Sequence, residues 1–205
     1  MSVSTSNDSI TLAFYEKHAR EYWESTVRQD LHQLYQPFLK RLVPGAHILD
    51  AGCGSGRDTK AFLERGYRVT AIDASPEMAK LATAFTGQPC DILSFQQMEF
   101  REEFDGIWAC ASILHVPKCE MFDVMRRFIR ALKVSGHLYI SLKEGEAERL
   151  AEDGRFFNYY TEDSFREVLG NFPTICEVSF WKTEETRPGK TASPWLNYLL
   201  QKVHQ

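Results

Sequence analysis

The chain has 205 residues, of which 43% are hydrophobic and 25% are charged, and its formal net charge at pH 7 is −4. This length and composition are typical of a single folded domain with a full core. The acidic balance gives no long-range attraction for a polyanion such as nucleic acid, although a local basic patch could still form in the folded protein. No apolar run approaches the roughly 20 residues of a membrane span, and the polar start lacks the pattern of a signal peptide.

The cysteines and histidines predict neither a disulfide framework nor a metal site. The five cysteines are an odd set, and no two of them have the two-residue spacing of a zinc ligand pair. Free thiols in a reducing cytoplasm are therefore the expected state. The six histidines are dispersed along the chain. We thus expect a cytoplasmic protein that has no bound metal ion and no membrane partner.

In chain order, the first elements are a tail and two helices. Residues 1–9 are polar and predict a flexible tail. Residues 10–25 and 31–42 carry apolar groups at helical spacing. Tyr15 and Tyr22 lie seven residues apart in the first of these segments and so share one face of its helix.

These helices precede the first predicted strand, so the sheet can form without them. Because the tail leaves one end of the first helix free, we expect residues 10–43 to be a lid region. Within it, the helix over residues 10–25 would become ordered over a bound ligand. A helix that is permanently docked on the sheet is the alternative.

The most informative segment follows this region. A short apolar strand over 47–50 ends in an acid, Asp50, and glycines then occupy positions 52, 54 and 56. Glycine tolerates positive φ and lets a ligand lie against bare backbone, so the strand is expected to turn beneath a bound small molecule. A second apolar run, 67–72, is followed by Asp73, 17 residues after the last of these glycines. This order is that of a nucleoside-binding α/β domain, whose acid accepts hydrogen bonds from ribose hydroxyls.

The spacing of the glycines distinguishes between two kinds of cofactor. Dinucleotide-binding domains have a third glycine after a two-residue gap, where a helix N-terminus meets the pyrophosphate. Here the gap is one residue, and the next position is Arg57. The turn therefore suits a nucleoside with an amino-acid tail. A dinucleotide-binding dehydrogenase and a glycine-rich turn without any ligand are the alternatives.

The rest of the chain alternates helices with strands. Such alternation implies a parallel sheet with right-handed crossovers, whose ligands bind beyond the carboxyl ends of the strands. The segment 195–203 fits a helix or a strand by its pattern alone. The other expected elements are helices over 58–65, 76–85, 118–132 and 162–169, and strands over 88–92, 104–110, 137–142 and 175–181.

With these positions assigned, the chain resembles class I S-adenosylmethionine-dependent methyltransferases from about Phe14 to Lys202. Residues 49–58, which hold the glycines, are most similar to the small bacterial tellurite-resistance-type methyltransferases. Residues 104–109 are similar to the family's fourth-strand signature, and residues 115–117 match the loop after it. The segment before the fifth strand is also similar, with valine and serine in place of the usual proline and glycine.

The resemblance implies a single-domain, Rossmann-like α/β fold over residues 10–205. Its sheet has seven strands and is mostly parallel, with helices on both faces. The last strand, over 195–203, is expected to run antiparallel between the fifth and the sixth.

The resemblance also implies S-adenosyl-L-methionine as the cofactor, together with the residues that hold it. The glycine turn lines the methionine tail, Asp73 binds both ribose hydroxyls, and Asp91 with Ile92 reads the adenine edge. Asp50 reaches the ammonium, directly or through water, or only caps the turn. The two N-terminal tyrosines reach the cofactor tail or only pack their helix on the core. The expected cofactor-binding residues are Tyr15, Tyr22, Asp50, Ala51, Gly52, Cys53, Gly54, Gly56, Arg57, Asp73, Ala74, Asp91, Ile92, Ala109 and Cys110.

Methyl transfer from a sulfonium is an in-line displacement, so the protein mainly has to align the acceptor and exclude water. A base is needed only where the acceptor is protonated at neutral pH, and we therefore predict no catalytic residue. His115 is expected to contact the substrate or act as a base, unless it is a loop histidine bonded to backbone. The acceptor pocket is expected between the N-terminal helices and residues 110–115 and 143–160.

The predicted function is methyl transfer from S-adenosyl-L-methionine to a small molecule or an inorganic oxyanion, by a monomer or homodimer. Methylation of tRNA or protein is a second hypothesis, but it would require a basic face or an added recognition domain, and neither is visible. A cofactor-binding protein without transfer activity is a third. Its basis is that the sequence signal lies in the cofactor site and not in the acceptor site.

Overall fold

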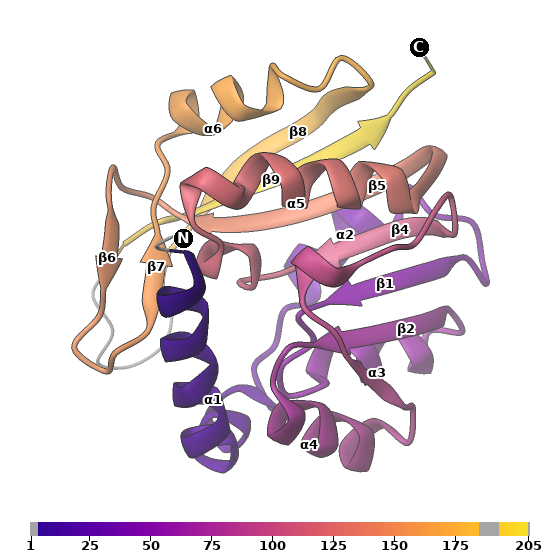
Figure 1. Cartoon of the computed structure of the whole chain (residues 1–205). Coiled ribbons are helices and arrows are strands. Elements are labelled where there is room, and N and C mark those ends of the chain that lie inside the picture. Colours follow the sequence, from indigo (N-terminus) through magenta and orange to yellow (C-terminus); the bar gives the residue numbers. More distant parts are fainter. Residues whose placement is uncertain (1–3, 185–192, 205) are drawn as a thin grey trace.

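The computed structural model describes residues 4–184 and 193–204. The strands of its main sheet are β1 (His47–Ala51), β2 (Arg68–Asp73), β3 (Cys90–Ile92), β4 (Phe104–Ala109), β5 (Leu132–Lys143), β8 (Ile175–Thr183) and β9 (Trp195–Lys202). These seven strands lie in the order β3-β2-β1-β4-β5-β9-β8 (Figure 1). Pairing is parallel from β3 to β5, and β9 is antiparallel to both β5 and β8. The predicted fold is therefore confirmed, including the place of the last strand.

Helices cover both faces of this sheet. They are α1 (Ser4–Thr26), α2 (His32–Leu39), α3 (Arg57–Glu64), α4 (Pro76–Thr86), α5 (Lys118–Ala131) and α6 (Glu162–Leu169). In Figure 1, α5 lies in front of the sheet and α2 behind it. The buried side chains of α5 and α6 pack in one apolar cluster, and those of α2 and α3 pack in another.

The first helix begins earlier than predicted and contains a bend. It starts at Ser4 and so includes residues that we expected in a flexible tail, while residues 1–3 of that tail lie outside the described residues. A polar composition does not by itself stop a helix, because packing of its later residues stabilises it. At His18 the backbone leaves helical geometry, with φ −112° and ψ 18°. Residues 4–17 and 19–26 therefore form two segments joined at His18.

The strand order reverses at β1, which lies between β2 and β4. The connections on either side of such a strand diverge, and a crevice opens at its carboxyl end. Here the chain turns with Gly52, Gly54 and Gly56 at φ 75°, 52° and 76°, values that disfavour any other residue. A Cβ on Gly56 would also lie 3.0 Å from the Cα of Ala82 on α4. Backbone geometry thus requires the glycines at this turn.

A buried carboxylate joins the helices of one face to the sheet. Asp58 on α3 accepts hydrogen bonds from Tyr35 Oη at 2.6 Å and from Trp108 Nε1 at 2.8 Å. The guanidinium of Arg57 donates to the same carboxylate from Nε at 2.6 Å and Nη2 at 2.9 Å. Trp108 in turn stacks on Tyr139 of β5, with ring centroids 3.9 Å apart. These contacts hold α2, α3, β4 and β5 together next to the glycine turn.

A small second sheet was not predicted. β6 (Glu148–Leu150) pairs antiparallel with β7 (Phe156–Asn158) inside the stretch 143–160, which we expected only as a wall of the acceptor pocket. Strands of three residues are too short to reveal an alternating pattern. The residues of β7 are buried, and the strand lies next to α1 (Figure 1).

Over the two described ranges, none of the helices has the length and apolar character that crossing a membrane would require. The same residues include no group of three or more His, Cys, Asp or Glu side chains placed to hold a metal ion.

Candidate functional site

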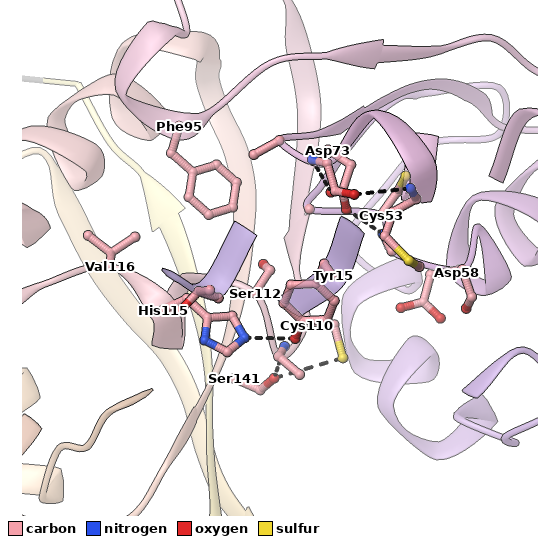
Figure 2. Close-up of a pocket in the computed structure, with 18 of the residues that line it drawn as sticks. Tyr15, Cys53, Asp58, Asp73, Phe95, Cys110, Ser112, His115, Val116 and Ser141 are labelled. Carbon is pink, nitrogen blue, oxygen red and sulfur yellow. Dashed lines mark hydrogen bonds between the residues drawn. The ribbon is translucent and has the colours of Figure 1, made fainter. Parts of the chain in front are cut away.

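The carboxyl ends of β1, β2 and β4 open into a cavity of about 830 Å³. Small-molecule sites typically have volumes of roughly 300–1,000 Å³. Figure 2 shows part of the lining, with Asp73 and Cys53 on one side and Tyr15 and His115 on another. The predicted site residues that line the cavity are Tyr15, Tyr22, Gly52, Cys53, Gly54, Arg57, Asp73, Ala74, Ile92, Cys110 and His115.

The other five predicted residues do not line this cavity: Asp50, Ala51, Gly56, Asp91 and Ala109. Asp50 lies buried beneath the glycine turn, where it accepts a hydrogen bond from Thr59 Oγ1 at 2.5 Å. Asp91 is exposed on the edge strand β3, and the next residue, Ile92, lines the cavity instead. The family resemblance was the basis of these predictions, but successive residues of a strand point to opposite faces, so only some residues at a strand end reach the cavity.

The carboxylate of Asp73 forms part of the cavity wall next to the glycine turn. Its oxygens accept hydrogen bonds from the backbone N–H groups of Gly54 at 2.8 Å and Ser75 at 2.9 Å. Burial raises the pKa of Asp73, although both hydrogen bonds act in the opposite direction. Each oxygen keeps a further lone pair. The carboxylate is therefore held in one orientation and can accept two more hydrogen bonds from a ligand.

The glycine turn leaves backbone open to the cavity. An ideal Cβ on Gly52 would lie 2.6 Å from the Cβ of Ser112, so that position has no room for a side chain. A Cβ on Gly54 would instead have no neighbour nearer than Tyr22, at 3.8 Å. A side chain at Gly54 would thus take up space next to Asp73 that a ligand can otherwise use.

Tyr15 on α1 and His115 after β4 meet across the cavity (Figure 2). The hydroxyl of Tyr15 and Nε2 of His115 are 2.9 Å apart, and His115 Nδ1 lies 2.6 Å from the carbonyl oxygen of Phe156. A carbonyl can only accept, so Nδ1 carries the proton and Nε2 accepts from the tyrosine. Burial lowers the pKa of His115 to about 4, so the ring is neutral at pH 7. The histidine thus bonds to backbone through one nitrogen and presents a proton acceptor through the other.

Two further side chains of α1 hold it over the cavity, and neither was predicted. Glu16 Oε1 accepts from the hydroxyl of Ser75 and, at 3.2 Å, from the backbone N–H of Glu77, at the start of α4. Thr11 Oγ1 accepts from the backbone N–H of Phe156 at 2.9 Å. Nothing in the sequence near Glu16 or Thr11 signals partners so far along the chain.

The guanidinium of Arg57 donates its hydrogen bonds to other side chains of the protein. Besides its two bonds to Asp58, it donates from Nη1 to Gln29 Oε1 at 3.2 Å. Nearby, burial raises the pKa of the Cys110 thiol to about 12, so this sulfur stays protonated. Arg57, whose charge is balanced by Asp58, and the neutral thiol of Cys110 therefore add polar surface to the cavity without adding a net charge.

Ser112, Ser141 and Phe95 also line the cavity. Ser112 lies in the stretch 110–115 that we expected to frame the acceptor pocket, whereas Ser141 and Phe95 were not predicted. Ser112 donates to the carbonyl oxygen of Ala51 at 2.7 Å, and Ser141 accepts from the backbone N–H of Ala111 at 2.7 Å.

The protonation of Asp50, which lies beneath the turn, makes the stability of the protein depend on pH. Burial and the neighbouring carboxylate Asp58 raise the pKa of Asp50 to about 8. An aspartate in an unfolded chain has a pKa of about 3.9. Between these values the native state holds a proton that the unfolded state has lost. This group therefore lowers stability progressively as pH rises from about 4 to 8.

We expect Asp50→Asn to remove that loss. Its free energy of unfolding relative to the parent should rise by about 1 kcal/mol per pH unit between pH 5 and 7. Urea unfolding at the two pH values measures the difference, with Asp163→Asn, at an exposed position of α6, as the control. A gap between variant and parent that does not change with pH would contradict a protonated Asp50.

Comparison with known proteins adds to this geometry. Residues 49–140 match the family model described as a methyltransferase domain. The ubiquinone biosynthesis O-methyltransferase of Xanthomonas campestris pv. campestris is 31% identical over 111 residues, which cover 48% of this chain and 44% of that protein. This match therefore spans less than half of the curated relative's length. An uncharacterized methyltransferase of Staphylococcus carnosus is 26% identical over 171 residues, covering 80% of this chain and 81% of the relative.

A solved structure shares the whole fold. The 1,6-didemethyltoxoflavin-N1-methyltransferase of Burkholderia thailandensis, crystallised with 1,6-didemethyltoxoflavin and S-adenosylhomocysteine, superposes with a TM-score of 0.77 at 23% identity. The superposition covers 100% of this chain and 92% of that one.

Proposed function

We propose that this chain is a class I S-adenosylmethionine-dependent methyltransferase, which binds S-adenosyl-L-methionine and methylates a small molecule; its fold and the methyltransferase domain matched over residues 49–140 support this. The observation that carries the proposal is the open glycine turn next to the oriented carboxylate of Asp73, at one wall of the cavity. The relatives support a small-molecule acceptor, because one is named for ubiquinone biosynthesis and another holds 1,6-didemethyltoxoflavin.

The residues present fit this cofactor. Asp73 would accept hydrogen bonds from the two ribose hydroxyls with its free lone pairs. The bare backbone at Gly54 would lie against the methionine tail. Ile92 and Phe95 offer apolar surface for the adenine, and Tyr22 covers the turn from α1. When bound, the cofactor supplies a methyl group that its sulfonium activates for displacement.

The Tyr15–His115 pair supports an acceptor that has to lose a proton. An acceptor O–H or N–H can donate its proton to Tyr15 Oη while the tyrosine proton moves to His115 Nε2. The hydrogen bond from Nδ1 to Phe156 would then offset part of the burial that disfavours the imidazolium. The neutral ring is ready for this step at pH 7, and its proton afterwards returns to solvent.

An inorganic oxyanion remains the alternative acceptor, and the tellurite-resistance-type methyltransferases remain the proposed subgroup, because residues 49–58 are similar to theirs. We also propose a cytoplasmic location, which the five free thiols favour. Methylation of tRNA is less favoured, because the net charge of −4 gives no attraction for a polyanion.

Asp73→Ala should weaken binding of S-adenosylhomocysteine by about 1.5–3 kcal/mol, since it removes hydrogen bonds to a charged group. Calorimetry measures this affinity, and the parent should bind S-adenosylhomocysteine but bind NAD poorly. Asp91→Ala is the matched control, because this exposed carboxylate on the neighbouring strand β3 does not line the cavity. Parental affinity in Asp73→Ala, with the fold intact, would refute the ribose role.

Tyr15→Phe and His115→Gln should each lower kcat by about 100-fold or more with O–H or N–H acceptors, because each breaks the proton path. Binding of S-adenosylhomocysteine should change little in His115→Gln. Nitrogen-15 NMR of the histidine rings gives an independent readout, in which His115 should titrate near pH 4 with its proton on Nδ1. Full activity in both variants, or a proton on Nε2, would remove the pair from the mechanism.

The N-terminal lid region, residues 10–43, stays part of the proposal. The contacts of Thr11, Tyr15 and Glu16 all precede His18, where the helix geometry breaks. A swing at His18 would release them together and open the cavity. Hydrogen exchange should show protection of residues 10–25 rising when S-adenosylhomocysteine binds. Complete protection of this segment in the free protein would indicate a permanently docked helix.

A further inference from the structure

Two cysteines from distant parts of the chain meet at the edge of the cavity, where Cys53 belongs to the lining and Cys90 does not. Cys53 belongs to the glycine turn and Cys90 is the first residue of β3, and their Sγ atoms are 3.3 Å apart. Both are free thiols. Because a disulfide bond is about 2.0 Å long, a relative movement of roughly 1.3 Å would join them.

The surroundings give the two thiols different roles. The side chains packed around them include the small ones of Ala71 and Ala82. Cys90 is partly exposed, whereas only 7% of Cys53 is accessible. An oxidant in solution therefore reaches Cys90 first. The contact with Cys90 and burial both raise the pKa of the Cys53 thiol well above its usual range, so Cys53 is protonated and resists direct oxidation.

We propose that a peroxide converts Cys53 and Cys90 into a disulfide that reversibly disables the cofactor site, a proposal that rests on the proposed function for the identity of the cofactor. Hydrogen peroxide transfers one oxygen atom to Cys90 Sγ, which gives a sulfenic acid and water. Cys53 Sγ then attacks that sulfur, the S–S bond forms and the S–O bond breaks, and the hydroxyl leaves with the Cys53 proton as water. Overall two thiols are oxidised and one peroxide is reduced to two waters.

The new bond would disturb the part of the turn that orients the ribose-binding acid. Cys53 stands between Gly52 and Gly54, and the N–H of Gly54 donates to Asp73 at 2.8 Å. Movement of Cys53 towards β3 would shift this N–H and the open backbone next to it. A bound cofactor would in turn hold the turn in place, so it should slow the oxidation.

The first experiment uses the full chain. The reduced protein is treated with hydrogen peroxide, and its unreduced tryptic peptides are mapped by mass spectrometry. We expect a Cys53–Cys90 linked peptide, a loss of S-adenosylhomocysteine affinity of about tenfold or more, and recovery of both thiols and affinity after addition of a phosphine reductant. Prior saturation with S-adenosylhomocysteine should delay the cross-link.

Two serine variants distinguish the effect of oxidising this pair from the effect of oxidising other cysteines. Cys90→Ser should keep its S-adenosylhomocysteine affinity after peroxide treatment, because Cys90 does not line the cavity and no partner remains for Cys53. Cys119→Ser, at an exposed position on α5, should stay as sensitive as the parent.

A map in which Cys53 and Cys90 stay unlinked would overturn the proposal, and so would a cross-link that leaves the affinity unchanged. If the reduced parent fails to bind S-adenosylhomocysteine at all, the proposed cofactor is wrong. The peptide map still decides in that case whether the two thiols pair.

Discussion

The structure of the site depends on one buried carboxylate, that of Asp58. Burying an ionised carboxylate is costly unless an opposite charge and hydrogen bonds surround it. Burial would raise the pKa of Asp58, but Arg57 and the hydroxyl and indole donors of Tyr35 and Trp108 hold it below its usual value. Arg57 and Asp58 directly follow the glycine turn, so these bonds fix the turn to α2, α3 and β4 from below.

That arrangement also explains why the neighbouring acid is neutral. Asp50 and Asp58 lie under the same turn, and Arg57 compensates one negative charge. Because Asp50 is buried and lies near the ionised carboxylate of Asp58, it keeps its proton up to about pH 8. The floor of the turn is polar but carries no net charge, whereas Asp73, held by the N–H groups of Gly54 and Ser75, is the carboxylate aligned for a ligand.

The site thus combines a rigid part with a part that is held by a few contacts. The turn and the strand ends belong to the sheet and its buried clusters. The N-terminal segment of α1 is tied down by Thr11, Tyr15 and Glu16 to β7, His115 and α4. The small number of bonds at one end of a bent helix supports the lid that we propose, which would open for ligands and close against water.

Much of the fold follows from local patterns in the sequence. Apolar runs, glycines and the acids after the strands sufficed for β1, β2 and β4 and for the parallel architecture. The place of β9 came from the family resemblance, because its pattern fits a helix equally well. The hairpin β6–β7 and the early start of α1 escaped prediction, since strands of three residues show no period and packing extends helices beyond their apolar part.

For the site, the sequence by itself determined the glycine turn and Asp73, because the spacing of these residues along a single βαβ unit identifies them. Only the tertiary structure decided which strand-end residues reach the cavity, and it excluded Asp50 and Asp91 from the lining. It also decided the pairs Tyr15–His115 and Cys53–Cys90, whose members lie 100 and 37 residues apart. No local spacing encodes such pairs, because the distance between their atoms is set by how α1 packs on the sheet and how β3 pairs at its edge.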